Sequence, residues 1–172
     1  MFDGAFDANV LLDFCHAGAI DVLIDAFGPR AHVAEHVRHV ELGKGKRNGL
    51  PDPCVVAGTA WVTTVDDLDT DEYQLTDDLT LRLGEHHRGE AQTIAICYYR
   101  RLVFVTRDGK ALRAAANRGI SVTTTTGVLN ELLRTGTREA SEVLAIAEAM
   151  HSRGVIPGDV ILTSLDSSQT LG

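Results

Sequence analysis

Residues 101–119, "RLVFVTRDGKALRAAANRG", constrain the fold more strongly than any other part of the sequence. Arg101 is followed by five consecutive apolar or β-branched residues, a run typical of a strand that is buried on both faces of a parallel sheet. The turn pair Asp108 and Gly109 comes next, and then a helical segment that ends at a glycine. Because parallel strands need a crossover between them, usually a helix, this strand–helix unit predicts a parallel sheet covered by helices.

Strands and helices alternate along the rest of the chain as well. We expect strands at residues 1–8, 29–34, 101–106 and 120–126, and a peripheral strand at 60–68, where acidic residues follow at once. Helices are expected over residues 9–18, 19–28, 35–46, 79–89, 89–100, 109–119, 127–136 and 137–154, and residues 47–54 form a loop. This order predicts a three-layer α/β/α fold with a central parallel sheet.

The chain length of 172 residues suits a single domain. We expect this domain over residues 1–163, followed by a poorly ordered tail over residues 164–172. No run of 18 apolar residues occurs, and the N-terminus lacks the basic segment of a secretory signal. Three scattered cysteines without a CxxC spacing are typical of buried free thiols in a reducing compartment. These features predict a cytoplasmic protein that does not bind membranes.

Carboxylates follow two of the expected core strands. Asp7 ends the first strand, and Asp108 lies just past the strand at 101–106. Each aspartate has an ordinary explanation, since Asp7 is placed to cap the next helix and Asp108 precedes a glycine in a turn. Ligands of open parallel sheets, however, bind beyond the carboxyl ends of the strands, where the strand order reverses. Two aspartates at such ends therefore point to a shared site.

Glu90 adds a third carboxylate. It directly follows Gly89 and opens a helix in which Ala91, Ile94, Ala95 and Tyr98 define one buried face. Glu90 stands four residues before Ile94, on nearly the same row as that face, which is unusual for a solvated charge. Converging carboxylates repel one another, and a divalent cation that prefers oxygen ligands relieves the repulsion. Such a site suits metal-dependent hydrolysis of a phosphodiester.

The sequence resembles the PIN-domain ribonucleases, specifically the branch that contains toxins of type II toxin–antitoxin systems. The matching segments are "FDANVLLDF", "VRHVELG", "GEAQTIAIC" and "VFVTRDGKALRAAANRGISVTTTTGVL", which run in order through nearly the whole chain. The resemblance implies a Mg²⁺- or Mn²⁺-dependent endoribonuclease with an acidic metal site. It assigns Asp7, Glu90 and Asp108 as metal-binding and catalytic residues.

The second acidic position of the family pattern has two candidates, Glu41 and Glu35. Val33, Val37 and Val40 define the buried stripe of the expected helix, and on a regular helix Glu41 borders this stripe while Glu35 points roughly opposite. Glu41 also precedes a leucine, as the family pattern requires, although its spacing from the strand is about one residue longer. We prefer Glu41 and keep Glu35 as the alternative.

The resemblance also implies partners. Arg107, Lys110 and Arg113 lie on or beside the loop after Asp108, where they are placed to contact the RNA backbone. A toxin of this branch would have an antitoxin protein that covers the acidic groove, most simply with an arginine in place of the metal, and would form a homodimer. The net charge of −8 argues only against a protein whose main role is to coat nucleic acid.

Other interpretations of the sequence remain open. One is a catalytically silent PIN-like scaffold. A phosphatase or receiver domain is a weaker alternative, because "DAN" lacks the second carboxylate of an Asp-x-Asp motif and "ISVTTTT" supplies no lysine. Thr106 is either a further member of the acidic cluster or an ordinary strand-end threonine. A structural zinc site at His32, His36 and His39 is the least favoured of these hypotheses.

Overall fold

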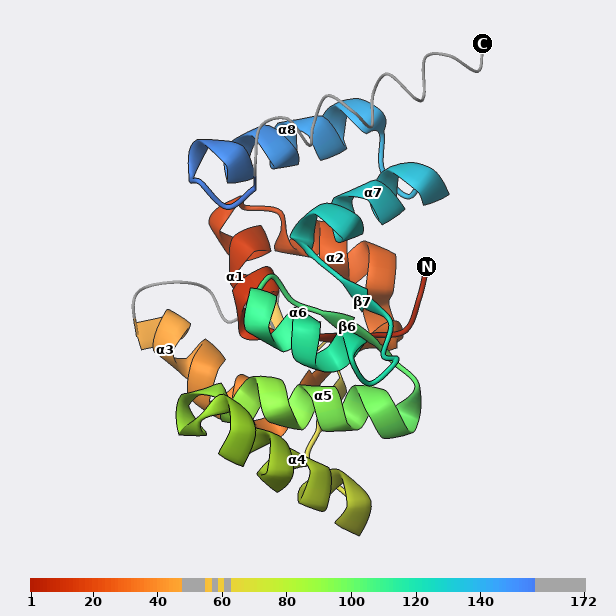
Figure 1. Cartoon of the computed structure of the whole chain (residues 1–172). Helices are drawn as coiled ribbons and strands as arrows, with labels where there is room; N and C mark the ends of the chain where they lie inside the picture. Colours follow the sequence, from red (N-terminus) through yellow and green to blue (C-terminus); the bar gives the residue numbers. More distant parts are fainter. Residues whose placement is uncertain (48–54, 57–58, 61–62, 157–172) are drawn as a thin grey trace.

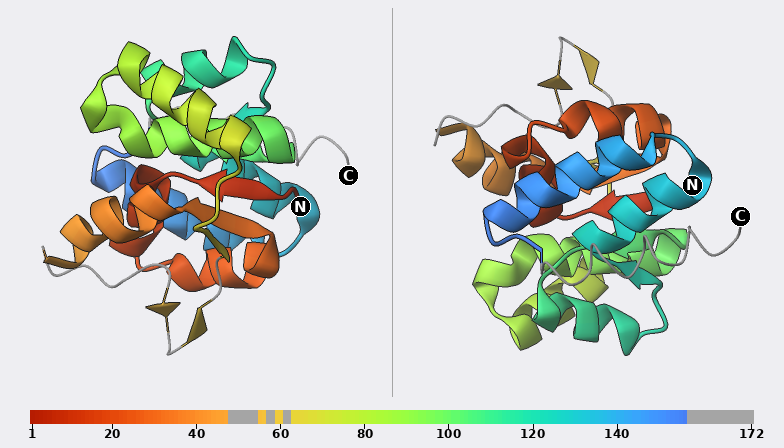
Figure 2. Two further views of the ribbon diagram at one scale, coloured as in Figure 1. Left: turned by 90° about the horizontal axis from the view of Figure 1, so that it is seen from below. Right: turned by 90° about the horizontal axis from the view of Figure 1, so that it is seen from above.

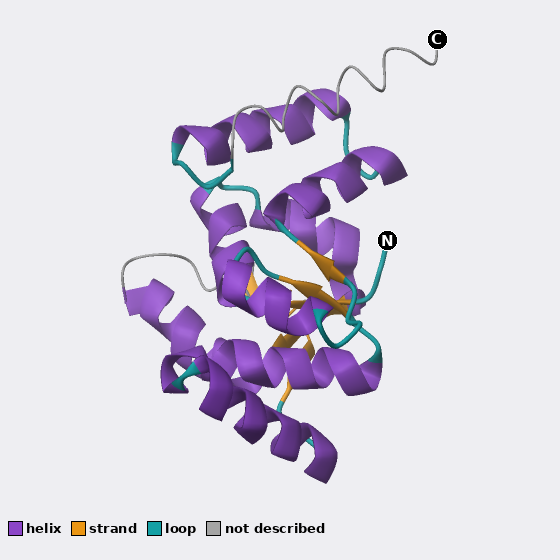
Figure 3. Cartoon of the chain, viewed as in Figure 1, coloured by secondary structure: helices purple, strands orange, loops and turns teal. Residues whose placement is uncertain are grey.

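The computed structural model describes residues 1–47, 55–56, 59–60 and 63–156. In this part of the chain, five strands form one fully parallel sheet in the order β5-β2-β1-β6-β7. The strands are β1 (Gly4–Phe6), β2 (Ala31–Ala34), β5 (Thr63–Val65), β6 (Val103–Val105) and β7 (Val122–Thr123). The sheet runs through the middle of the molecule with helices on both faces, which confirms the predicted three-layer α/β/α fold (Figures 1 and 3).

Two groups of helices cover the two faces of the sheet (Figure 2). The first core, around Phe6 of β1 and Val105 of β6, is closed by α1, α2, α7 and α8. The second core, around Ala5 and Phe104 of the same two strands, is closed by α4, α5 and α6. Alternate residues of each strand thus serve opposite cores, as the pleat requires. The helices are α1 (Ala8–His16), α2 (Ile20–Phe27), α4 (Thr70–Leu83), α5 (Arg88–Arg100), α6 (Gly109–Ala116), α7 (Thr125–Thr135) and α8 (Ala140–Ser152).

The strand order reverses beside β1. The chain proceeds from β1 to β2 and then to the edge strand β5, after which β6 returns to the other side of β1. Both neighbours are parallel to β1, so the carboxyl ends of β1, β2 and β6 meet at one edge of the sheet. This edge is where an open α/β sheet binds its ligands. The backbone N–H of Asp7 continues the pairing by donating to Val105 O at 2.9 Å.

Several element boundaries differ from the sequence-based prediction. Helix α4 begins at Thr70 rather than at residue 79, because Asp69 and Glu72 form a capping box at its start. The helix then stops at Gly84, whose φ of 107° is in the range that favours glycine, so residues 79–89 are not one helix. Residues 120–126 contain only the short strand β7, because Thr124 caps helix α7. A short antiparallel pair, β3 (Val55–Val56) and β4 (Thr59–Ala60), precedes β5.

Two predicted core positions are exposed. Tyr98 near the end of α5 is 47% exposed and stands edge-on against Tyr99. Val40 is 39% exposed, because the segment after β2 does not continue as a regular helix. No helix in the described ranges is long and apolar enough to cross a membrane. The predicted tail at 164–172 and nearly all of the predicted loop at 47–54 lie outside the described residues.

An ion pair between a buried carboxylate and a partly exposed arginine joins helices α4 and α5. The carboxylate of Glu72 in α4 is 1% exposed and accepts hydrogen bonds from Arg100 Nε at 2.7 Å and Nη2 at 2.8 Å. Glu72 also accepts from the backbone N–H of Asp69 at 3.0 Å, within the capping box. A bidentate pair of this kind fixes the register of α4 against α5.

We expect Arg100→Leu to lower the free energy of unfolding by about 1 to 2 kcal/mol, because the variant removes two hydrogen bonds and the cation from the buried Glu72 carboxylate, although the exposed side of the pair is screened by solvent. Urea unfolding followed by circular dichroism measures the change. The double variant Glu72→Gln/Arg100→Leu also removes the unpaired negative charge of Glu72. It should therefore recover part of the lost free energy of unfolding. If the double variant were less stable than Arg100→Leu alone, the buried charge would not be the source of the destabilisation.

Candidate functional site

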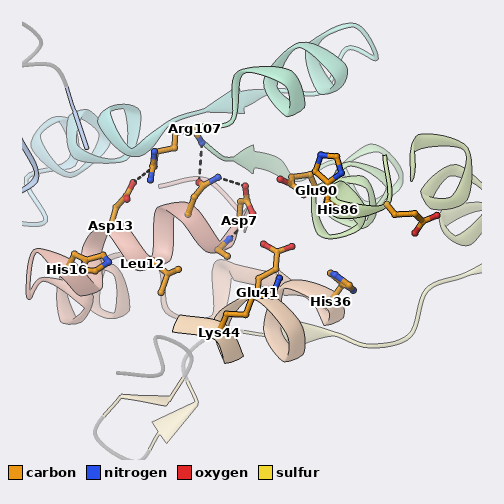
Figure 4. A pocket seen from close by; sticks show the side chains of 13 residues that line it. Asp7, Leu12, Asp13, His16, His36, Glu41, Lys44, His86, Glu90 and Arg107 are labelled. Atoms are coloured by element: carbon orange, nitrogen blue, oxygen red, sulfur yellow. Dashed lines mark hydrogen bonds and ion pairs between the residues drawn. The ribbon is translucent and has the colours of Figure 1, made fainter. Parts of the chain in front are cut away.

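A cleft of about 680 Å³ lies at the carboxyl edge of the sheet (Figure 4). Five carboxylates line it, those of Asp7, Asp13, Glu41, Glu85 and Glu90. Three of them come from three separate segments and form its acidic centre: Asp7 after β1, Glu41 after β2 and Glu90 in the first turn of α5. Lys44 and Arg107 also line the cleft and lie on opposite sides of Asp7 and Glu41 in Figure 4. The cleft therefore has an acidic centre flanked by cations.

The Asp7 carboxylate is held by hydrogen bonds from the first turn of α1 and from Thr106 at the end of β6. It is 1% exposed, and its Oδ1 accepts from the backbone N–H of Ala8 at 2.8 Å as the N-cap of α1. Its Oδ2 accepts from Thr106 Oγ1 and from Asn9 Nδ2, each at 2.6 Å. Burial raises the pKa of Asp7 to about 6; the Thr106 bond opposes this shift, while the negative charge of Glu90 adds to it. Thr106 is thus part of the cluster rather than an ordinary strand-end threonine.

Glu41 reaches the cleft through a π-helical turn, Val37–Glu41, which leads into the short helix α3 (Leu42–Arg47). A π turn holds one more residue than an α-helical turn, and such turns are frequent at functional sites. The π turn therefore places Glu41 in the cleft and Val40 at the surface. Burial raises the pKa of Glu41 to about 8, and the charges of Asp7 and Glu90 contribute to the increase.

Glu35, the alternative to Glu41, is exposed and does not line the cleft. It borders a second, smaller pocket together with His36 and His39. The structure therefore places Glu41, and not Glu35, beside Asp7.

Gly89 allows Glu41 and Glu90 to approach each other. A Cβ atom at residue 89 would lie 1.8 Å from Glu41 Oε1, so only glycine leaves room for this carboxylate against the start of α5. Glu90 Oε1 faces His87 Nδ1 at 3.3 Å, while Glu90 Oε2 is buried and has no hydrogen-bond partner among the described residues. A buried carboxylate oxygen without a partner is costly, so a ligand that contacts Oε2 would be favoured at this point of the cleft.

Asp108 lies beside the cluster rather than in the lining of the cleft. Its Oδ1 accepts from the backbone N–H groups of Lys110 and Ala111 at 2.9 and 2.7 Å, so it caps α6. Its negative charge still contributes to the raised pKa of Asp7, and its own N–H donates to Thr106 Oγ1 at 3.1 Å. The structure thus brings Asp7, Glu41 and Glu90 together, with Asp108 at their margin.

Of the three basic residues predicted to contact RNA, Arg107 is the one that lines the cleft. Lys110 Nζ donates to the carbonyl oxygen of Leu83 at 2.5 Å, and Arg113 is exposed on α6. Lys44 also lines the cleft, and its positive charge lowers the pKa of Glu41 in opposition to the larger effect of burial.

Two functional candidates were missed from the sequence. Asn9 donates to Asp7 and also accepts from the backbone N–H of Arg107 at 3.3 Å. Asp13, one helical turn later, is 2% exposed and forms an ion pair with Arg107 Nε at 3.0 Å. A carboxylate between the apolar neighbours Leu12 and Phe14 was the available signal for Asp13.

The predicted histidine trio does not form a cluster. His32 lies within β2, whereas His36 and His39 lie in the segment that follows it. His36 borders both the cleft and the smaller pocket beside Glu35. His39 borders the smaller pocket but not the cleft.

The carboxylate oxygens of the cleft are donors of the type that a hard divalent cation prefers. No three His, Cys, Asp or Glu side chains within the described residues are grouped closely enough to hold a metal ion as they stand. Mg²⁺, however, commonly keeps several waters and takes only one or two carboxylates directly. The unpartnered Glu90 Oε2 and the raised pKa values of Asp7 and Glu41 are the features that a cation among these oxygens would relieve.

No protein-family model matches the chain, and neither a curated protein nor a solved structure is significantly similar to it. The resemblance to PIN-domain ribonucleases therefore stays a prediction from the sequence.

The raised pKa of Glu41 predicts a pH-dependent stability. Folding raises this pKa from 4.5 to about 8, so the folded state loses stability as pH rises through this interval. Glu41→Gln removes the ionisation and should raise the melting temperature relative to the parent at pH 8 in metal-free buffer, with little difference at pH 4.5. Addition of Mg²⁺ at pH 8 should stabilise the parent more than the variant. An equal pH dependence in the two proteins would contradict this assignment.

Gly89→Ala tests the close approach of Glu41 to α5. The added methyl group meets the end of a flexible side chain, so the helix should form normally while Glu41 swings out of the cleft. We expect near-parental thermal stability but a reduced Mg²⁺-dependent stabilisation at pH 8. Gly109→Ala is the matched control, since its new Cβ would meet only Arg113 Nη1 at an ordinary 3.5 Å.

Proposed function

We propose that the protein is a Mg²⁺- or Mn²⁺-dependent endoribonuclease. The observation that carries the proposal is the convergence of Asp7, Glu41 and Glu90 from three segments on one cleft at the strand-order reversal, with Glu90 Oε2 buried and unpartnered. An acidic site of this kind suits phosphodiester hydrolysis better than a phosphate-binding role, because an anionic substrate is repelled unless a cation intervenes. The choice of RNA over DNA rests on the resemblance to the PIN family.

Asp7, Glu41 and Glu90 would hold the metal, with Asp108 as an outer carboxylate. When bound, the cation supplies an activated water and charge stabilisation at the phosphate. Thr106 and Asn9 orient the Asp7 carboxylate through their hydrogen bonds to Oδ2, and the N-terminus of α1 favours its ionised form. Glu41 must release its proton to ligate a cation, so the affinity for Mg²⁺ should increase as pH rises.

The cations of the cleft would bind the substrate. Arg107 and Lys44 flank the acidic centre, where a phosphate on either side of the cleaved bond would meet a positive charge. These contacts are independent of base sequence, so they determine position on the backbone and not the target sequence.

The biological role that the sequence resemblance favours is that of a cytoplasmic type II toxin. An antitoxin protein would then cover the acidic cleft, and the toxin would form a homodimer. Expression of the parent should arrest bacterial growth, and Asp7→Asn should abolish the arrest. A variant that cleaves no RNA yet still arrests growth would favour the silent-scaffold alternative.

Asp7→Asn and Glu90→Gln should each lower Mg²⁺-dependent cleavage of single-stranded RNA by more than about 100-fold, because each removes a carboxylate that would hold the metal. Gel analysis of a labelled RNA, with all proteins purified in parallel to exclude host ribonuclease, measures the effect. Glu139→Gln, an exposed glutamate at the start of α8, is the matched control and should cleave like the parent. Full cleavage by folded Asp7→Asn would refute the proposed site.

Glu35→Gln separates the two candidates for the second acidic position. We expect Glu41→Gln to lose cleavage and Glu35→Gln to retain it, since Glu35 lies outside the cleft. The opposite pattern would assign the position to Glu35.

A further inference from the structure

We propose that Asp13 is a positioning residue that holds the Arg107 guanidinium at the rim of the cleft as a fixed contact for an RNA phosphate. This inference rests on the proposed endoribonuclease function and adds to it a residue that the acidic cluster does not include.

The Asp13 carboxylate lowers the stability of the fold, because it is buried away from water. Its side chain is 3% exposed, and burial raises its pKa, opposed by the hydrogen bond from Thr125 and by the charge of Arg107. Helix α1 is otherwise packed into the first core at this level by Leu11, Phe14 and Cys15. A neutral residue would pack there without the cost of a desolvated charge. The retained charge therefore has a use that packing does not supply.

The contacts of Asp13 are directed at one side chain in the cleft. Asp13 Oδ2 accepts from Thr125 Oγ1 at 2.9 Å and lies 3.0 Å from Arg107 Nε. The guanidinium has five N–H donors in a planar fork, and the contact to Asp13 uses the Nε edge. The Arg107 side chain is 50% exposed and lines the cleft, so its terminal nitrogens are accessible to an anion.

Helix α1 holds Arg107 at two points. Asn9 and Asp13 are four residues apart and therefore lie on the same face of the helix. Asn9 accepts from the Arg107 backbone N–H at 3.3 Å, and Asp13 pairs with the Arg107 side chain (Figure 4). Asn9 also donates to Asp7 Oδ2, so one helix face sets both the catalytic carboxylate and the cationic contact. An arginine held in this way loses less conformational entropy when a phosphate binds.

The sign of the effect on RNA binding distinguishes positioning from simple electrostatics. If Asp13 acted only through its charge, Asp13→Asn would remove a negative charge beside the cleft and tighten the binding of anionic RNA. If Asp13 positions Arg107, the same variant should weaken binding, because the guanidinium is no longer held at the rim. Asn at position 13 keeps an oxygen that can accept from Thr125 Oγ1, so the link to α7 is preserved.

The experiment measures binding of a fluorescein-labelled single-stranded RNA with Ca²⁺ in place of Mg²⁺, so that a cation neutralises the carboxylates, and a gel checks that the RNA stays intact. We expect Asp13→Asn and Arg107→Ala each to weaken binding roughly five- to tenfold. We also expect each to lower the slope of log affinity against log salt by about 0.7, the value for one phosphate contact. The double variant should be no weaker than Arg107→Ala alone, because Asp13 acts through Arg107.

Thr125→Val is the matched control. It removes the hydrogen bond from Thr125 to Asp13 but leaves the ion pair with Arg107, so RNA affinity and salt slope should stay near the parental values even if stability falls. Equal or tighter binding by folded Asp13→Asn, or additive losses in the double variant, would overturn the positioning role. Failure of the parent itself to bind RNA would instead refute the proposed function on which this inference rests.

Discussion

The Asp7 carboxylate is the contact on which the rest of the site depends. It begins α1, accepts from Thr106 at the end of β6, and accepts from Asn9 on the first turn of α1. These hydrogen bonds join the two central strands to the helix that leaves one of them, at the point where the strand order reverses. The buried charge is tolerated because both oxygens are hydrogen-bonded, yet its pKa remains raised to about 6. The fold thus holds a carboxylate firmly while leaving its charge incompletely compensated.

The negative charges of Glu41 and Glu90 are also incompletely compensated. Glu41 takes a raised pKa from burial and from its acidic neighbours, and Glu90 keeps one buried oxygen without a partner. A chain selected only for stability would replace these groups by neutral or apolar ones, which commonly stabilises a protein. Gly89 shows that the crowding is structural as well as electrostatic, because any side chain there would collide with Glu41. These destabilising carboxylates lie at the carboxyl edge of the sheet, where a bound ligand would offset their unfavourable energy.

The layers of the fold could be predicted from the sequence because the apolar run at 102–106 and the alternation of strands and helices are strong local signals. The start of α4 was missed because its signal is a capping box of two acidic residues in a polar stretch, where hydrophobic periodicity is weak. In the site, Asp7 and Glu90 could be found from their places after a strand and beside a buried helix face. Glu41 could be preferred over Glu35, but the π turn that brings it inward has no sequence signature, and Val40 was therefore wrongly predicted as buried. The roles of Asn9 and Asp13 depend on contacts with residues that lie about a hundred positions away in the sequence. The periodicity of a single helix does not reveal such contacts.

The two faces of helix α1 make different contacts: one packs in the core, and the other contacts side chains of the cleft. Val10, Leu11 and Phe14 fill the first core, while Asn9 and Asp13 face the loop after β6. Because the apolar face anchors α1 against the sheet, the polar face presents its groups to Arg107 and Asp7 from a rigid support. Asn9 contacts both Asp7 and Arg107, and Asp13 contacts Arg107, so helix α1 links the position of the Asp7 carboxylate to that of the Arg107 cation. The proposed cleavage of a phosphodiester would depend on this arrangement, since the substrate backbone would have to meet the carboxylates and a positive charge at a fixed spacing.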